Sequence, residues 1–239
     1  MKLAVMQPYF FPYPGYFQLM AHADTWVVFD HCQFVNKGWV NRNRVLHPNP
    51  EKGWQYITVP LSKRGRFDFI DDIEIDDSSD WRKSLTGKLV HYRRAPNYRK
   101  TMSVFESAIG APNAVLSRFL THSLRVLADH LGINTKILVY SELDLGIDQV
   151  AHSGEWALKI AKAMGAEHYI NPMGGQALFD PAQFREAGIG LSFMESTIRP
   201  YVQNGYDYVP NLSILDALMW CDEGTLQDIL LNDFTLHPA

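Results

Sequence analysis

The chain has 239 residues, of which 46% are hydrophobic and 20% charged, and its formal net charge is -4 at pH 7. These values are those of an ordinary globular protein, and a negative net charge argues against general nucleic-acid binding, which depends on a surplus of Lys and Arg. Every apolar run is far shorter than the roughly 18 residues of a membrane span, and residues 1–5 are too short for a signal peptide. We therefore expect a cytoplasmic protein without a membrane span.

The first part of the chain has the pattern of a βαβ unit. Residues 2–6 (KLAVM) predict a buried strand, residues 15–23 a helix, and residues 25–29 (TWVVF) a second buried strand. A strand, a helix and a strand at this spacing normally give parallel strands joined by a right-handed crossover. This unit is the strongest architectural signal in the chain.

The elements that follow also favour an α/β fold. The sequence predicts strands over residues 54–61, 135–143, 167–170 and 190–196, and helices over residues 81–94, 112–131, 154–164, 181–187 and 212–221. We predict a single α/β domain over residues 1–239, with a mostly parallel, Rossmann-like sheet and flanking helices. The helices around residues 80–131 would form an insertion in this domain.

Polar residues follow several of the predicted strands. Ligands of open α/β sheets bind beyond the carboxyl ends of the strands, so these residues would converge on one cleft if the strands are parallel neighbours. They are Gln7 after the first strand, Asp30 and Gln33 after the second, Ser141 after the ILVY run, and Asn171, Gly174 and Gly175 after the strand at 167–170.

An aromatic and proline-rich loop, MQPYFFPYPGYF, follows the first strand at residues 6–17. Gly15 opens the next helix, where free N–H groups and the helix dipole favour an anion. Tyr13 and Tyr16 add hydroxyl groups to the same loop, so all three residues are candidates for ligand binding. The alternative is that Gly15 only turns the chain and the aromatic rings pack over the edge of the sheet.

The most suggestive polar run is Asn41-Arg42-Asn43-Arg44. Guanidinium groups make bidentate hydrogen bonds to oxyanions, so this run predicts contacts to a diphosphate and to sugar hydroxyls. If the run is an exposed strand, Arg42 and Arg44 share one face and the asparagines share the other. A solvated basic edge that prevents sheet aggregation is an equal alternative.

Two residues are candidates for a general base, His91 and Asp30. His91 is followed by Tyr92, a candidate for substrate contact, and by two arginines at the predicted end of a helix. The C-terminal end of a helix stabilises cationic side chains whether or not they have a function. The alternative is therefore that His91 has a purely structural role.

The sequence gives no support to a metal site or to a cysteine nucleophile. Cys32 and Cys221 stand far apart and match no metal-binding or redox spacing, so we expect two reduced, buried thiols. No Walker A, G-x-G-x-x-G, G-x-S-x-G or H-E-x-x-H motif is present. Any cofactor is left unidentified.

Several unusual segments, in a fixed order, resemble the WbqC-like protein family. They are QPYFFPYPGYF, ADTWVVFDHCQF, WVNRNR, WQYITVPL, GAEHYINPMGG and RPYVQ…VPNLSILDAL, and together they extend over nearly the whole chain. The resemblance implies a role in the assembly of O-antigen and other surface polysaccharides, in which amino-acyl groups such as glycyl decorate amino sugars. It implies a cytoplasmic transferase whose partners are a nucleotide-linked amino sugar and an activated amino-acyl or acyl donor.

Two other functions stay open. The N-terminal strand, loop and helix are also similar to those of nucleotidylyltransferases, and ATP would then activate a donor acid as an adenylate. Gly15-Tyr16 stands where that superfamily has Gly-His, and a tyrosine cannot act as the imidazole that stabilises the phosphate in transfer. The second alternative is a non-catalytic binding protein in a glycan-assembly system.

Overall fold

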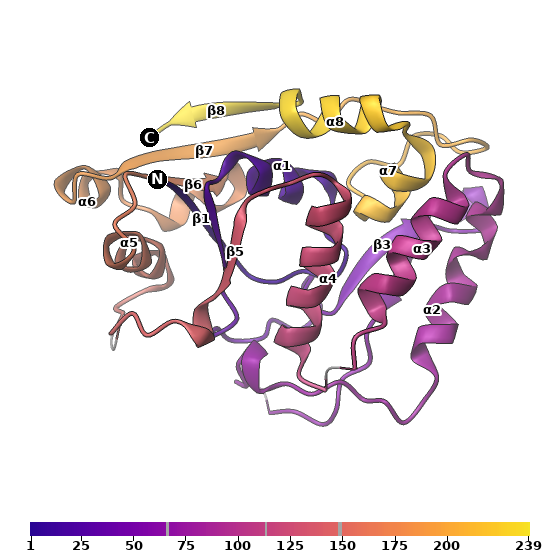
Figure 1. Cartoon of the computed structure of the whole chain (residues 1–239), viewed down its shortest axis with the longest axis horizontal. Helices are drawn as coiled ribbons and strands as arrows, with labels where there is room; N and C mark the ends of the chain where they lie inside the picture. Colours follow the sequence, from indigo (N-terminus) through magenta and orange to yellow (C-terminus); the bar gives the residue numbers. More distant parts are fainter. Residues whose placement is uncertain (66, 113, 148–149) are drawn as a thin grey trace.

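A six-stranded sheet forms the centre of the computed structural model, which describes residues 1–65, 67–112, 114–147 and 150–239 (Figure 1). Its strand order is β5-β2-β1-β6-β7-β8, and every neighbouring pair is parallel except β7 with β8. The strands are β1 (Lys2–Met6), β2 (Thr25–Val28), β5 (Lys136–Val139), β6 (His168–Pro172), β7 (Gly190–Ser196) and β8 (Phe234–Pro238). The predicted α/β fold with a mostly parallel sheet is confirmed.

The order of the strands reverses between β1 and β6. From β1 the chain builds outward through β2 to β5, and then returns to the other side of β1 to add β6 and β7. β1 pairs with β2 as far as Met6, whereas its described pairing with β6 involves only Lys2 and Leu3. β1 and β6 therefore separate toward their carboxyl ends, which opens the sheet at the reversal.

Alternate side chains of the strands face two separate hydrophobic clusters. Leu3 and Val5 of β1 belong to one cluster, and Ala4 belongs to the other. In β2, Val27 faces the first cluster and Trp26 faces the second. Parallel strands that are buried on both faces need an apolar side chain at nearly every position, which explains the continuous apolar runs in the sequence.

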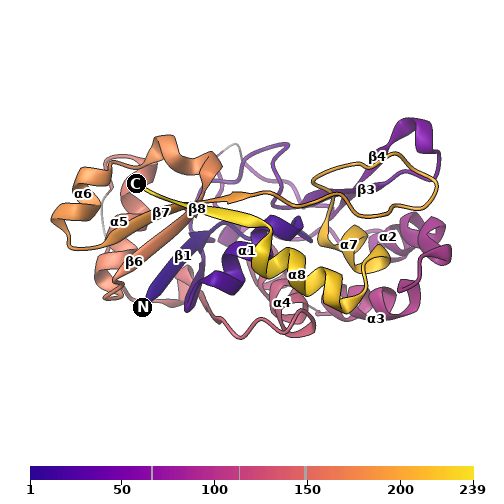
Figure 2. The ribbon, with the colours of Figure 1, turned by 90° about the horizontal axis from the view of Figure 1, so that it is seen from above.

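Helices cover both faces of the sheet, and the two termini lie at the same end of it, on strands β1 and β8 (Figure 2). Residues of α5 (Ser153–Ala163) and α6 (Pro181–Glu186) pack in the cluster of Leu3, and those of α1 (Pro14–His22) and α8 (Glu223–Asn232) pack in the cluster of Ala4. No helix within the described ranges is long and apolar enough to cross a membrane.

The predicted helical insertion is present, and it lies to one side of the sheet together with a two-stranded ribbon (Figures 1 and 2). The ribbon pairs β3 (Arg42–Leu46) with β4 (Trp54–Thr58) in antiparallel register. The insertion contains α2 (Trp81–Leu89), α3 (Tyr98–Ile109) and α4 (Leu116–His130). The described chain also contains the helix α7 (Ile214–Trp220). Its 3-10 helices are η1 (Pro50–Lys52), η2 (Ile70–Asp72), η3 (Val90–Arg94), η4 (Tyr140–Glu142) and η5 (Met173–Leu178).

Some boundaries differ from those predicted. The helix predicted over residues 81–94 ends at Leu89 and continues as the 3-10 helix η3. The helix predicted over residues 112–131 begins at Leu116, and position 113 lies outside the described residues. α3, α8 and β8 have no counterpart among the predicted elements, whereas β3 overlaps the strand considered for residues 41–44. Pairing with β7 defines β8, but α3 buries Met102, Phe105 and Ile109 at helical spacing, a local pattern that the prediction missed.

Candidate functional site

A cavity of about 900 Å³ lies where β1 and β6 separate, and we call it the switch-point cavity. The carboxyl end of β1 contributes Gln7 to its wall, and the carboxyl end of β6 contributes Asn171. Open parallel sheets bind their ligands outside the carboxyl ends of the strands at the reversal of strand order. The position of this cavity makes it the candidate functional site.

The structure brings half of the predicted site residues to this cavity. Those that line it are Gln7, Tyr13, Gly15, Asn43, Arg44, Asn171, Gly174 and Gly175. Those outside its described lining are Tyr16, Asp30, Gln33, Asn41, Arg42, His91, Tyr92 and Ser141. Their functional roles stay predictions, and the contacts below show what each group is free to do.

Arg44 is the cation of the described wall. Its guanidinium carbon lies 5.3 Å from the ring centre of Trp39 and 5.1 Å from that of Trp54. One terminal nitrogen donates a hydrogen bond to the backbone oxygen of Asn211 at 3.2 Å, while its buried Nε has no partner among the described residues. A guanidinium that two rings hold in place, with an unused N–H group, is suited to bind an oxyanion.

Two other residues of the Asn-Arg run hold the protein's own backbone. Arg42 donates hydrogen bonds to the backbone oxygens of Lys37 and Gly38. Asn41 donates a hydrogen bond to the backbone oxygen of Val59 at 2.9 Å. These hydrogen bonds use side-chain donors of Asn41 and Arg42 to hold the backbone beside the ribbon. Arg44 is therefore the arginine of this run that lines the cavity.

The wall of the cavity is rich in aromatic rings. Burial raises the pKa of both Tyr9 and Tyr13, and the nearby Tyr13 and Cys32 raise the pKa of Tyr9 further. Both hydroxyls therefore stay protonated at neutral pH and are available as hydrogen-bond donors. The aromatic residues of the described wall are Tyr9, Tyr13, Phe29, Trp39, Trp156, Tyr169 and Phe179.

Protein atoms fill the space beside the start of α1. A Cβ added to Gly15 would stand 2.3 Å from Cε2 of Tyr13 and 2.7 Å from Oγ of Ser196, so the close approach that requires glycine here is made by the protein itself. Tyr16 is buried, and its hydroxyl donates a hydrogen bond to the backbone oxygen of Gln7 at 2.9 Å. The helix start thus offers an anion less room than the sequence suggests.

The second glycine-containing loop also packs against the protein. Asn171 is buried; its Nδ2 donates to the backbone oxygen of Pro172 at 2.9 Å and its Oδ1 accepts from the hydroxyl of Tyr169 at 3.1 Å. A Cβ on Gly175 would stand 2.2 Å from Nδ2 of Asn171. The glycine therefore lets the loop close over the end of β6, and Gly174 beside it borders the cavity.

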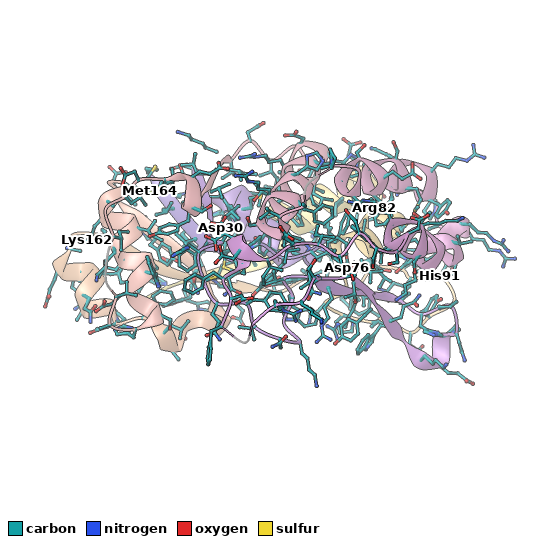
Figure 3. The ribbon with its side chains drawn as sticks, turned by 90° about the horizontal axis from the view of Figure 1, so that it is seen from below. Asp30, Asp76, Arg82, His91, Lys162 and Met164 are labelled. Atoms are coloured by element: carbon teal, nitrogen blue, oxygen red, sulfur yellow. The ribbon has the colours of Figure 1, made fainter. Side chains whose placement is uncertain are left out.

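The two candidate bases are far from each other. Figure 3 shows Asp30 near the middle of the molecule and His91 at the end formed by the helical insertion. The carboxylate of Asp30 is fully buried and accepts hydrogen bonds from the backbone N–H of Ser141 at 3.0 Å and from its hydroxyl at 2.7 Å. His91 lines a separate hollow of about 650 Å³, and burial lowers its pKa.

Two more candidates have structural partners. The buried hydroxyl of Tyr92 accepts a hydrogen bond from the backbone N–H of Leu46 at 2.8 Å and donates one to the buried carboxylate of Asp216 at 2.7 Å. Gln33 is exposed and forms an isolated β-bridge with Phe69. Both contacts lie away from the described wall of the cavity.

Both cysteines have free thiols, as predicted, although Cys32 is only half-buried. Burial raises the pKa of Cys32 to about 12 and that of Cys221 to about 12, so neither thiol is ionised at neutral pH. Among the described residues, no group of three or more His, Cys, Asp or Glu side chains is placed to hold a metal ion.

Several residues of the wall are absent from the predicted site. Glu195 and Ser196 lie at the carboxyl end of β7, so the rule that points to Gln7 and Asn171 would also have pointed to them. Trp39 and Asn211 lie in the segments WVNRNR and VPNLSILDAL, which carry the resemblance to the family, whereas Trp156 of α5 lies in none of the quoted segments.

The fold and the cavity define an α/β protein with a candidate ligand site at the reversal of a parallel sheet. The chain belongs to the WbqC-like protein family, whose sequence model matches residues 7–228. It is also similar to the uncharacterized protein Rv1507c of Mycobacterium tuberculosis, with 26% identity over 226 residues that cover 91% of this chain and 92% of the relative. No solved structure matches the chain.

Proposed function

We propose that the chain is a transferase of surface-polysaccharide assembly, which moves an amino-acyl or acyl group onto the amine of a nucleotide-linked amino sugar. The observation that carries this proposal is the position of Arg44, the cation in the described wall of a cavity of about 900 Å³ at the sheet reversal. A nucleotide-linked sugar needs such a cation for its diphosphate and a deep, mostly uncharged wall for its sugar. The role implied by the resemblance to the family supports this choice.

The polar groups of the wall supply the remaining contacts. Arg44 binds the diphosphate, because a guanidinium forms charge-assisted hydrogen bonds to phosphate oxygens. The neutral hydroxyls of Tyr9 and Tyr13 donate hydrogen bonds to the sugar or to the acyl carbonyl. Gln7, at the end of β1, orients the sugar at the bottom of the cavity, and Asn171, at the end of β6, contributes the second N–H of its amide group, since only one bond from its Nδ2 is made within the protein.

Transfer to an amine requires a base that removes a proton from the ammonium group. We assign this role to Glu195, the acidic residue of the described wall, whose Oε2 lies 2.9 Å from Nε2 of His237. The neutral amine then attacks the acyl carbon, a C–N bond forms, and the bond to the donor's leaving group breaks. Asp30 is less suited, because Ser141 occupies both of its oxygens, and His91 faces another hollow.

Incubation with a UDP- or dTDP-linked 4-amino sugar tests the proposal directly. The donors are acyl thioesters, aminoacyl-tRNA, and an amino acid with ATP, and mass spectrometry detects the acylated sugar. Arg44→Gln should weaken binding of the sugar nucleotide by about 1.5–3 kcal/mol, the value of a hydrogen bond to a charged group. Arg93→Gln, at an exposed arginine of the other hollow, is the matched control and should change nothing.

The outcomes separate the alternative functions. Glu195→Gln should abolish turnover and leave binding of the sugar nucleotide unchanged. Pyrophosphate release that depends on an amino acid would indicate an adenylate-forming ligase, and binding without turnover from any donor would indicate a non-catalytic binding protein. If the sugar nucleotide does not bind and no donor gives a product, the proposal is wrong.

A further inference from the structure

An exposed face of the β3–β4 ribbon carries arginines and aromatic rings in close contact. We call it the ribbon face, and its residues are Trp39, Arg42, Arg44, Trp54 and Tyr56. Arg42 lies over the ring of Tyr56 at 4.2 Å, and Trp54 contacts Tyr56 with 4.9 Å between ring centres. The register pairs Arg44 with Tyr56, which places their side chains on the same face of the ribbon.

The ribbon face is continuous with the switch-point cavity. Trp39 and Arg44 belong to both, and Arg44 lies against Trp39 as well as Trp54. Trp39 is 37% exposed and Trp54 is 36% exposed, which is unusual for a residue that normally buries its large apolar surface. An aromatic platform thus stands at the cavity's ribbon end, next to its cation.

The usual phosphate position of this fold is closed in this chain. Rossmann-type sheets hold phosphates on backbone N–H groups of a glycine-rich loop between β1 and α1. Here Pro8 and Pro12 of that loop, and Pro14 at the start of α1, have no N–H group, and the N–H of Phe10 is bonded to the backbone oxygen of Trp39 at 3.1 Å. As described above, Tyr13 and Ser196 fill the space beside the helix start.

We propose that the ribbon face binds the nucleoside diphosphate part of the substrate, with the base stacked on Trp39 and the diphosphate on Arg44. The nucleotide then lies on the ribbon and not on the loop between β1 and α1, and the sugar lies at the ends of β1 and β6. This inference rests on the proposed function, since it divides the same substrate between the two ends of one cavity.

The chemistry of the face favours a nucleotide over a neutral glycan. Its side chains donate hydrogen bonds and carry positive charge, and neither β3 nor β4 contains an Asp or Glu that could accept hydrogen bonds from sugar hydroxyls. A base provides a flat π-surface that stacks on an exposed indole, and the adjacent diphosphate provides the negative charge that Arg44 can bind.

Calorimetric titration of the full chain with UDP, dTDP, GDP and ADP tests the inference without any need for turnover. Trp39→Leu should weaken binding of the nucleoside diphosphate about tenfold, the loss expected when one base loses its aromatic platform. Trp39→Phe keeps a ring and should restore most of the affinity. Arg44→Gln should weaken binding and also reduce its dependence on salt. Circular dichroism checks that each variant is folded.

Two results would overturn the inference: no nucleoside diphosphate binds, or Trp39→Leu binds it as well as the wild type does. If a neutral oligosaccharide quenches the tryptophan fluorescence and no nucleoside diphosphate does, the ribbon face binds glycan and the inference is wrong. Failure of the proposed function has a different signature. In that case UDP or dTDP binds in a manner that depends on Trp39, yet no donor gives an acylated sugar.

Discussion

The side-chain amide of Asn43 donates a hydrogen bond to the backbone oxygen of Phe11 at 2.9 Å. Phe11 has a positive φ of 43°, a conformation that costs free energy for any residue with a Cβ. The same amide group also reaches the backbone oxygen of Phe10 at 3.2 Å. A buried asparagine of the ribbon therefore fixes the strained turn of the aromatic loop, and with it the position of Tyr9 and Tyr13 in the cavity.

Replacement of Asn43 should destabilise the protein. Asn43→Ala removes these two hydrogen bonds, and also the one that Oδ1 of Asn43 accepts from the backbone N–H of Arg44, so the free energy of unfolding should fall by about 1–3 kcal/mol. Urea denaturation measures the change. Asn36→Ala is the matched control, because Asn36 is exposed and accepts its hydrogen bond from the exposed Arg64. Equal losses in the two variants would contradict the role of Asn43.

Tyr92→Phe should affect stability and not ligand binding. The change removes a buried hydroxyl that links the backbone of Leu46 to the carboxylate of Asp216, and we expect a loss of about 1–3 kcal/mol in the free energy of unfolding. Tyr206→Phe removes a half-buried hydroxyl bonded to the backbone oxygen of His47 and should cost less. If Tyr92→Phe greatly weakens binding of the sugar nucleotide and leaves the stability unchanged, Tyr92 contacts the ligand and the structural role is wrong.

A pair of glycine substitutions should have opposite signs. Gly15→Ala forces a Cβ into the ring of Tyr13 and should lower the unfolding free energy by about 1–3 kcal/mol, as overpacking does. Gly87→Ala, inside α2, meets no atom within 4 Å and should raise it by about 0.4–1 kcal/mol, since alanine restricts the unfolded chain. Thermal unfolding of both variants gives the comparison. A neutral Gly15→Ala would show that Tyr13 has room to move.

The protein should lose stability as the pH falls below about 6.5. Burial lowers the pKa of His22, His91, His130 and His168, so each binds its proton more weakly in the folded chain than in the unfolded one. Their contribution to stability is complete above the ordinary histidine pKa and is lost as the pH drops through 6.5 toward the lowered values.

Urea unfolding at pH 7.5 and at pH 5.5 measures this effect. The free energy of unfolding should be smaller at pH 5.5, and the difference should shrink in His168→Gln, which removes one of the four titrating groups. A free energy that rises between pH 7.5 and pH 5.5 would contradict the assignment of lowered pKa values.

Local patterns were sufficient for the parallel strands of the main sheet, and half of the predicted site residues line the cavity. The apolar runs at KLAVM and TWVVF are strands because their side chains are buried on both faces, and this requirement is visible in the sequence itself. Gln7 and Asn171 follow such runs, so the carboxyl-end rule places them at the cavity. The same rule fails for Asp30 and Ser141, because a hydrogen bond between the two residues satisfies both side chains.

The α/β class, the buried strands and the polar strand ends can be predicted from the sequence, since all of these depend on local periodicity and on residue type. Which polar side chains have no partner depends on the tertiary structure. Arg42 and Arg44 stand two positions apart on the same face, yet Arg42 is engaged with the backbone of residues 37 and 38, while Arg44 keeps an unused N–H group beside Trp39. The partners of Arg42 are only four and five residues away, whereas Arg44 is held by the backbone of Asn211 and the ring of Trp54, which only the folded chain brings next to it.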